Sequence, residues 1–222
     1  MKRYAVYFAP RAGAFATRAN AWLGRDPTSG QSLTQPELPG IDAAAITTQA
    51  RSYGFHGTIR APFRPAEGMV QGDISQAVAA MAAGLAPVTC TGLRLENLHG
   101  FLALTPEGCE AELLALAATV VEATNPLRAP LTSAEITRRR PESLTARQRE
   151  LLDLWGYPFV MDEFRFHLTL TDQLRDPGPA MAALRKHFAP VLPRPFVIED
   201  LCLFGEDHAG DFHLLHRYAL TG

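Results

Sequence analysis

Cysteines and long apolar runs are scarce in this chain of 222 residues. The three cysteines, Cys90, Cys109 and Cys202, lie far apart and lack the CxxC spacing of a zinc site or a redox pair. We therefore expect reduced thiols, and with them a cytoplasmic location. The apolar segment near the start is interrupted by Pro10 and is too short for a secretory signal, and no later apolar run could cross a bilayer. The sequence thus predicts a soluble protein without a membrane partner.

An excess of positive charge is also missing, since the formal net charge is -2 at pH 7. Proteins that hold long nucleic acid through many phosphates carry a basic field, so this class is disfavoured. The one basic cluster is Arg138-Arg139-Arg140. It is either a solvated helix end or a surface that faces a phosphate, and the sequence leaves both interpretations open.

Several familiar catalytic motifs do not occur. The chain has no GxxxxGK[ST] loop, no GxGxxG and no GxSxG, which disfavours nucleoside triphosphatases, dinucleotide oxidoreductases and serine hydrolases. A zinc motif such as HExxH is missing too. A metal cluster remains conceivable only near the C-terminus, at Asp207, His208, Asp211, His213 and His216. We expect no metal and no other cofactor.

One order of elements occurs twice, and it is the most informative feature of organisation. Each copy is a strand, a helix and two further strands, a β-α-β-β unit. The first copy is expected at 54–63, 74–85, 88–95 and 101–105, and the second at 164–171, 179–188, 196–204 and 212–219. The interval from His56 to Phe101 equals the interval from His167 to Phe212. The sequence predicts an α+β fold of duplicated units.

The remaining segments fill in this plan. A strand within 1–10 is expected to join the sheet, and a helix around 15–23 to follow it. Residues 26–40 are rich in turn formers and read as a surface loop, either a lid or a plain connector. Helices are expected at 110–124 and from Thr145. With 47% hydrophobic residues, we expect residues 1–222 to form one two-lobed domain, with lobes at 44–106 and 161–222 and a helical insert at 107–160.

Both copies begin with a strand that carries a His-x-Thr motif. Side chains alternate across a strand, so His56, Thr58 and Arg60 should share one face while Phe55 and Ile59 share the other. In the second copy, Arg165, His167, Thr169 and Thr171 should project together, opposite Phe166, Leu168 and Leu170. A single motif of this kind is a weak signal, because each His and Thr could be an ordinary packing residue. The pair, at matching places in two units, is a strong one.

The pair suits the opening of a phosphodiester near neutral pH without a metal. One group must take a proton from the attacking water or hydroxyl, and another must give a proton to the departing oxygen. Imidazole serves both roles, because its ordinary pKa of about 6.5 allows a neutral and a charged copy to coexist. The hydroxyls of Thr58 and Thr169 could donate to the nonbridging oxygens, and Arg60 and Arg165 could add positive charge. The pattern does not indicate which histidine is the acid.

The sequence resembles the two-histidine phosphoesterase superfamily, and most closely its branch found in phosphonate-utilisation operons. The similarity runs almost end to end. Its markers are RYAVYFAP, WLGRD, RSYGFHGTIRAPF, FLALTP, RRRPESLTARQ and WGYPFVMDEFRFHLTLT.

The resemblance implies two lobes whose mainly antiparallel sheets face a central cleft, with helices outside. It implies a metal-independent cyclic phosphodiesterase in which His56 and His167 are catalytic and Thr58 and Thr169 bind phosphate. We expect a monomer, although nothing in the sequence decides the oligomeric state. The substrate would be a small cyclic ribose phosphate or nucleotide. Tyr53 and Tyr157 flank the motifs and could pack on a ribose or base, although core packing is their ordinary role.

Three alternatives stay open at this point. The chain could act on 2′,5′ or 2′,3′-cyclic RNA ends with the same histidines. It could be a phosphate-ester binding module that has lost turnover. It could also be a metal hydrolase that uses the C-terminal histidines.

Overall fold

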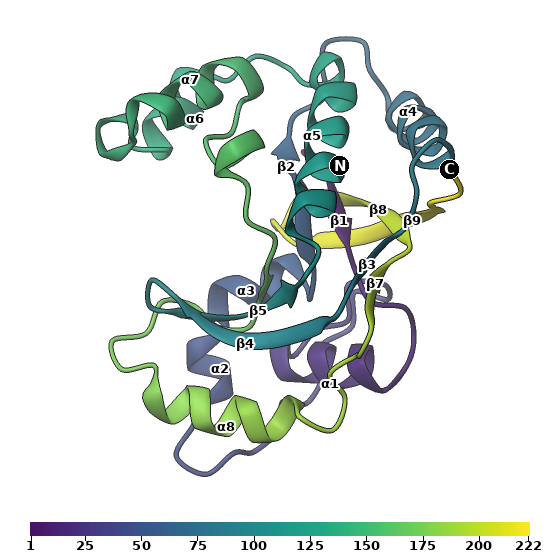
Figure 1. Cartoon of the computed structure of the whole chain (residues 1–222). Coiled ribbons are helices and arrows are strands. Elements are labelled where there is room, and N and C mark those ends of the chain that lie inside the picture. The colour runs from purple at the N-terminus through teal and green to yellow at the C-terminus, as the bar shows by residue number, and fades with distance from the viewer.

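Nine strands and eight α-helices make up the computed structural model, which describes residues 1–222 (Figure 1). Seven strands form one sheet in the order β4-β5-β6-β2-β1-β8-β9, and every neighbouring pair in it is antiparallel. The other two, β3 and β7, form a separate antiparallel pair. The predicted α+β class with antiparallel pairing is confirmed.

The strands of the large sheet come from both halves of the chain. They are β1 (Tyr4–Phe8), β2 (Gly57–Phe63), β4 (Gly92–Leu98), β5 (Phe101–Glu107), β6 (Leu168–Thr169), β8 (Asp200–Glu206) and β9 (Phe212–Ala219). The short pair is β3 (Val88–Cys90) with β7 (Phe196–Ile198). Strands of both expected lobes therefore share a single sheet, with the two motif strands β2 and β6 side by side near its middle.

Helices lie outside the sheet, as expected. They are α1 (Ala14–Leu23), α2 (Ala43–Ile46), α3 (Thr48–Tyr53), α4 (Gln71–Ala83), α5 (Glu110–Thr124), α6 (Ser133–Arg138), α7 (Ala146–Trp155) and α8 (Gly178–Phe188). Short 3-10 turns occupy Asn125–Leu127, Pro141–Ser143 and Met161–Glu163. Helix α4 packs on β8 and β9, α5 on β2, and α8 on β4, while α6 and α7 project to one side of the molecule (Figure 1).

Element boundaries differ from the sequence prediction at three strands. The expected strand at 88–95 divides at Thr91 into β3 and β4, and the one at 196–204 divides at Glu199 into β7 and β8. In each case the chain leaves the two-stranded pair and enters the large sheet at that residue. The expected strand at 164–171 pairs only over β6. Both motif strands, β2 and β6, are nevertheless followed by the same order of elements, one α-helix and then three strands before the next α-helix or the chain end.

The largest cluster of buried apolar residues contains side chains from both halves of the chain. Buried apolar residues of β1, β2, β5, β6 and β8 pack with those of α1, α4, α5 and α8 in one cluster of 34 residues. The ring of Trp22 on α1 is fully buried, and its Nε1 donates to the carbonyl of Leu170, 2.7 Å away. This bond anchors the end of the second motif strand to α1, which gives the WLGRD marker a structural role.

Cys90 and Cys109 form a disulfide, with their Cα atoms 4.9 Å apart. The expectation of three unpaired thiols is therefore wrong, because the turn after β5 brings Cys109 beside the end of β3 although 19 residues separate the two along the chain. Cys202 is free and buried. The expected cytoplasmic location had rested on reduced cysteines, and that support is removed.

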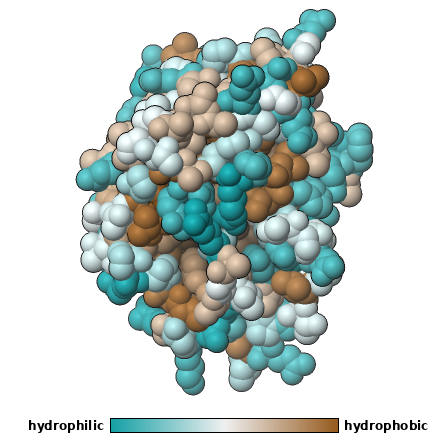
Figure 2. Space-filling view, turned by 90° about the vertical axis from the view of Figure 1, so that its right-hand side faces the viewer, coloured by the Kyte–Doolittle hydropathy of each residue, from teal (hydrophilic) through white to brown (hydrophobic).

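No helix is long and apolar enough to cross a membrane. On the face that Figure 2 presents, polar residues cover most of the surface and apolar residues occur in small separate groups. Scattered apolar residues of this kind are ordinary on folded proteins.

Candidate active site

The two His-x-Thr motifs meet through the pairing of β2 with β6. Gly57 is the register partner of Leu168. Because the strands are antiparallel, His56 then lies across from Thr169, and Thr58 across from His167. All four side chains stand on the same face of the sheet. The predicted pair of motifs is thus brought together on two adjacent strands.

The burial pattern follows the predicted alternation. Phe166, Leu168 and Leu170 are buried on the apolar face, while His167 and Thr169 are half-buried on the other. Likewise Phe55 and Ile59 are buried, whereas His56 and Thr58 are half-buried.

Gly57 allows the two motif strands, β2 and β6, to lie close together. A Cβ atom at Gly57 would overlap the ring of Phe166, which covers the strand there. Only a residue without a side chain lets the two motif strands approach so closely.

His56 is held by its backbone and by an aromatic ring. Its Nδ1 lies 2.9 Å from the carbonyl of Gly54, so Nδ1 carries the proton and donates it. Its Nε2 is then the acceptor, and it receives a hydrogen bond from the Thr58 hydroxyl, 3.3 Å away. The imidazole stacks on Tyr7, with ring centroids 3.9 Å apart. Burial is the largest influence on the pKa of His56 and lowers it to about 4. The hydrogen bond to the Gly54 carbonyl raises this pKa, and the charge of the nearby His167 lowers it.

His167 repeats the arrangement. Its Nδ1 lies 2.9 Å from the carbonyl of Arg165, again two residues earlier in the chain. Its ring centroid is 5.5 Å from that of Phe101 on β5. Burial also lowers its pKa, opposed by the bond to Arg165. Each ring therefore holds its proton on Nδ1 and has Nε2 as its acceptor, and the lowered pKa values favour the neutral form of both near pH 7.

A cavity of about 440 Å³ opens over this face of the sheet. His56, Thr58 and Thr169 line it together with Tyr53 and Tyr157, and His167 lies beside it next to the wall residue Phe101. Further wall residues come from β1, α3, β2 and β5 and from segments that flank elements: Arg3, Tyr7, Gln49, Ala50, Gly54, Ala61, Pro62, Phe101, Arg139, Thr171, Asp172 and Gln173. The cavity has the size of a small-molecule site.

Two of the predicted cations lie elsewhere. Arg165 is exposed and lines no part of the cavity, and only its carbonyl serves the site. Arg60 is 1% exposed and does not share the Thr58 cavity. The register of β1 on β2 slips between Tyr7, opposite Thr58, and Val6, opposite Arg60. This bulge breaks the alternation that would have placed Arg60 on the His56 face.

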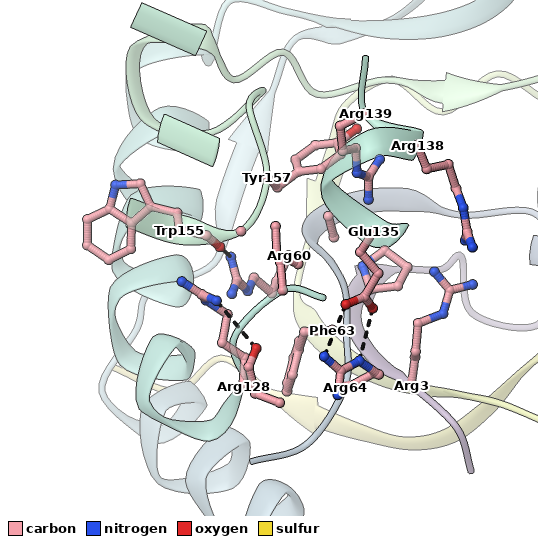
Figure 3. A pocket seen from close by; sticks show the side chains of 15 residues that line it. Arg3, Arg60, Phe63, Arg64, Arg128, Glu135, Arg138, Arg139, Trp155 and Tyr157 are labelled. Carbon is pink, nitrogen blue, oxygen red and sulfur yellow. Dashed lines mark hydrogen bonds and ion pairs between the residues drawn. The ribbon is translucent and has the colours of Figure 1, made fainter. Parts of the chain in front are cut away.

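Arg60 instead enters a smaller recess next to the cavity (Figure 3). Its Nη1 donates to the carbonyl of Trp155, 3.0 Å away. Burial, and then the charge of Arg128, lower the pKa of Arg60 to about 10. Arg139 and Tyr157 line both spaces, so the recess and the cavity are contiguous. Within the basic cluster, Arg138 and Arg140 are exposed at the end of α6, whereas Arg139 lines both spaces.

Several residues that line the cavity belong to no motif from which a role in the site could have been predicted. Tyr7 sits in an apolar strand and reads as core, and Arg3 precedes that strand without a motif. Asp172 accepts from the backbone N–H groups of Gln49 and Ala50 at the start of α3, which joins this short helix to the end of the second motif. Gln173 could have been found, since alternation extends the reactive face beyond Thr171.

The other residues with open roles lie away from the cavity. No residue of the 26–40 loop lines it, and Pro27 packs on Gly54, so a connector is the role the structure favours. His213 bonds Asp207 at 2.9 Å and lies 3.2 Å from Arg25. No three His, Cys, Asp or Glu side chains gather closely enough to hold a metal ion.

The family described as "Protein of unknown function (DUF1045)" matches residues 58–213, which is more than half of the chain. The chain belongs to this family. This membership is consistent with the resemblance, seen in the sequence, to the phosphonate-operon branch of the two-histidine phosphoesterases.

Two curated relatives match nearly the whole of this family member. A protein of Janthinobacterium sp. (strain Marseille) is 37% identical over 220 residues, and one of Laribacter hongkongensis (strain HLHK9) is 36% identical over 212 residues. The matches cover 95% and 94% of this chain but only 49% of each relative, so the chain spans about half the length of the relatives it matches. Both relatives are named "Ribose 1,5-bisphosphate phosphokinase PhnN".

A solved structure shares the fold. It is TT0787 of Thermus thermophilus, with a TM-score of 0.50, 15% identity, and coverage of 99% of this chain and 98% of that chain. At this identity the likeness shows the fold alone.

Proposed function

We propose that this family member opens a cyclic phosphodiester of a small ribose phosphate, with His56 and His167 as the acid-base pair. The observation that carries the proposal is the pairing of Gly57 with Leu168, which sets both His-x-Thr motifs on one face of adjacent strands. His56, Thr58 and Thr169 line the cavity of about 440 Å³, and His167 lies beside it next to Phe101, so a small phosphate ester can be placed between the two imidazoles.

The chemistry follows from these four groups. One Nε2 takes a proton from a water molecule, whose oxygen forms a new bond to phosphorus. The bond from phosphorus to one ring oxygen breaks, and the other imidazole, charged at that moment, gives its proton to this oxygen. The product is a phosphate monoester and a free hydroxyl. A bound phosphate raises the pKa of both rings through its negative charge, so one of them can be protonated in the complex although both are neutral without it.

His56 is the better candidate for the base. Its pKa of about 4 reflects an enclosed ring stacked on Tyr7, which favours the neutral form. The threonine hydroxyls donate to the nonbridging oxygens, where charge accumulates as water adds.

The names of the relatives point to a substrate. They describe a kinase acting on ribose 1,5-bisphosphate. This chain lacks the GxxxxGK[ST] loop by which many kinases hold a nucleotide. Hydrolysis of ribose 1,2-cyclic phosphate 5-phosphate at the bond to O2 would yield ribose 1,5-bisphosphate. The proposed reaction would then supply the compound that the relatives' name describes.

The test is a substrate panel followed by phosphorus NMR in the presence of a chelator. The panel contains ribose 1,2-cyclic phosphate 5-phosphate, nucleoside 2′,3′-cyclic phosphates and oligonucleotides with cyclic ends. We expect turnover of the ribose compound to ribose 1,5-bisphosphate. Faster turnover of oligonucleotides would favour an RNA-end enzyme, loss of activity with chelator would favour a metal hydrolase, and binding without turnover of any compound would favour a binding module.

A further inference from the structure

The recess beside the cavity carries an unusual concentration of positive charge. Six arginines line it, against one carboxylate, Glu135, in a chain of net charge -2. They are Arg3, Arg60, Arg64, Arg128, Arg138 and Arg139. As Figure 3 shows, they come from β2 and the residue after it, from the end of α6, from the segment that follows α5 and, for Arg3, from the residue before β1.

Four of these arginines have no carboxylate partner. Arg3 pairs with Glu206, and Arg64 pairs with Glu135 through two hydrogen bonds. Arg128 bonds only neutral oxygens, those of Asn125, Ala129 and Leu154. The guanidinium groups of Arg138 and Arg139 form no hydrogen bond to the protein, and that of Arg139 lies over the ring of Tyr157, 4.7 Å from its centroid.

Arg60 is the decisive residue. It is 1% exposed, it has no carboxylate partner, and its Nε has no hydrogen-bond partner at all. A buried charge without a counterion is expensive, and an unpaired donor adds to the cost. The Trp155 carbonyl and the ring of Phe63, whose centroid is 5.5 Å from the guanidinium carbon, are neutral groups and do not supply a counterion. A buried arginine without a counterion is tolerated where a bound anion supplies the opposite charge.

The shape of the recess places that anion at its mouth. Its volume of about 30 Å³ has room for roughly one water molecule. A larger group must therefore sit where the recess meets the cavity, at the wall shared by Arg3, Arg139 and Tyr157. Thr58 and Arg139 both line the cavity, so one small substrate can reach the histidine site and the mouth of the recess together.

We propose that the recess and its mouth form a subsite for a second phosphoryl group, a terminal phosphate monoester on the same substrate whose cyclic phosphate meets the two histidines. The inference rests on the proposed function. It makes the enzyme selective for substrates with two phosphates, one cyclic and one terminal, and it assigns this selectivity to Arg139 and Arg60.

The kinetic test compares substrates with and without the terminal phosphate. Ribose 1,2-cyclic phosphate 5-phosphate is compared with ribose 1,2-cyclic phosphate, in the wild type, Arg139→Gln and the control Arg140→Gln. Arg140 is exposed, lies in the same run of arginines and lines neither space. The ratio of the two kcat/KM values should fall by about tenfold or more in Arg139→Gln, because one charge-assisted contact is lost. It should be unchanged in Arg140→Gln. An equal ratio in the wild type and Arg139→Gln would overturn the subsite.

A binding test separates this inference from the proposed function. Ribose 5-phosphate and inorganic phosphate are titrated calorimetrically into the same three proteins and into the double variant Thr58→Val/Thr169→Val. The subsite predicts that ribose 5-phosphate binding weakens by about tenfold in Arg139→Gln and persists in the threonine variant. If ribose 5-phosphate binding is lost only in the threonine variant, the ligand binds at the histidines. That result would contradict the subsite even if catalysis is found. Arg139-dependent binding without turnover of any cyclic ester would keep the subsite and refute the proposed function.

Discussion

The enclosure of His56 couples its protonation to the stability of the fold. Its pKa is about 4 in the folded protein and about 6.5 when unperturbed, and burial is the largest cause. Between these pH values the unfolded chain binds more protons at His56 than the folded one. The contribution of His56 to the free energy of unfolding is therefore fully present above pH 6.5 and decreases as the pH falls toward 4.

We therefore expect the free energy of unfolding to decrease from pH 6.5 to pH 4. Denaturant titrations of the wild type and of His56→Gln will check this, and the variant should show a shallower decline because Gln cannot be protonated. Burial also lowers the pKa of His167, so part of the slope should remain in the variant. A slope that is identical in both proteins would show that His56 is not the group responsible.

Gly57 sets the distance between the motif strands. We expect Gly57→Ala to destabilise the protein by about 1–3 kcal/mol, because the new methyl group overlaps the ring of Phe166. Since Phe166 precedes His167, activity should fall as well. Thermal unfolding measures the first effect, and phosphate release the second.

Gly72→Ala on α4 is the matched control. Gly72 is exposed, and the nearest side-chain atom to an added Cβ is 4.0 Å away. Alanine favours a helix over glycine, so this variant should be as stable as the wild type or slightly more stable. Equal stability of Gly57→Ala and Gly72→Ala would contradict the proposed steric role of Gly57.

At the scale of elements, the disulfide between Cys90 and Cys109 ties the end of β3 to the start of α5. Closing a loop of this length restricts the unfolded chain and stabilises the fold by about 3 kcal/mol. Reductant should therefore lower the Tm of the wild type and leave the Tm of Cys90→Ala/Cys109→Ala unchanged. Thiol titration of the denatured, unreduced protein should find one reactive thiol, that of Cys202. Three reactive thiols would contradict the pairing.

Local patterns predicted the elements well where a single principle decides them. Helix α5 ends at Thr124 as Asn125-Pro126 requires, and β9 follows its apolar pattern from Phe212. Patterns could not predict where a strand changes sheet, because the breaks at Thr91 and Glu199 depend on the pairing of β3 with β7. The disulfide was missed for a related reason: the approach of Cys90 and Cys109 depends on tertiary folding and not on spacing.

The same distinction holds at the site. His56, Thr58, His167 and Thr169 could be found because two strands repeat one motif, and alternation correctly placed them on one face. Arg60 was misplaced because a bulge between β1 and β2 interrupts alternation, and the sequence alone gives no sign of it. The contributions of Tyr7, Arg3 and Asp172 arise from contacts between distant segments, which a single sequence does not display.

At the scale of the whole molecule, the sheet brings the two motifs together from opposite halves of the chain. The hairpin β4-β5 lies beside β6, so the first half of the chain supports the second motif strand, and Trp22 on α1 bonds its end. Strand β1 lies between β2 and β8 and places Tyr7 against His56. Each histidine is thus positioned by a local bond to the carbonyl two residues before it and by an aromatic ring from a distant segment.

The two-histidine mechanism is tested by the rate at which the wild type, His56→Ala and His167→Ala hydrolyse ribose 1,2-cyclic phosphate 5-phosphate, followed by phosphorus NMR. Circular dichroism first verifies that each variant is folded. We expect kcat to fall by about 10²–10⁴-fold in either variant, because each loses one positioned proton transfer. A wild-type rate in either folded variant would contradict the account.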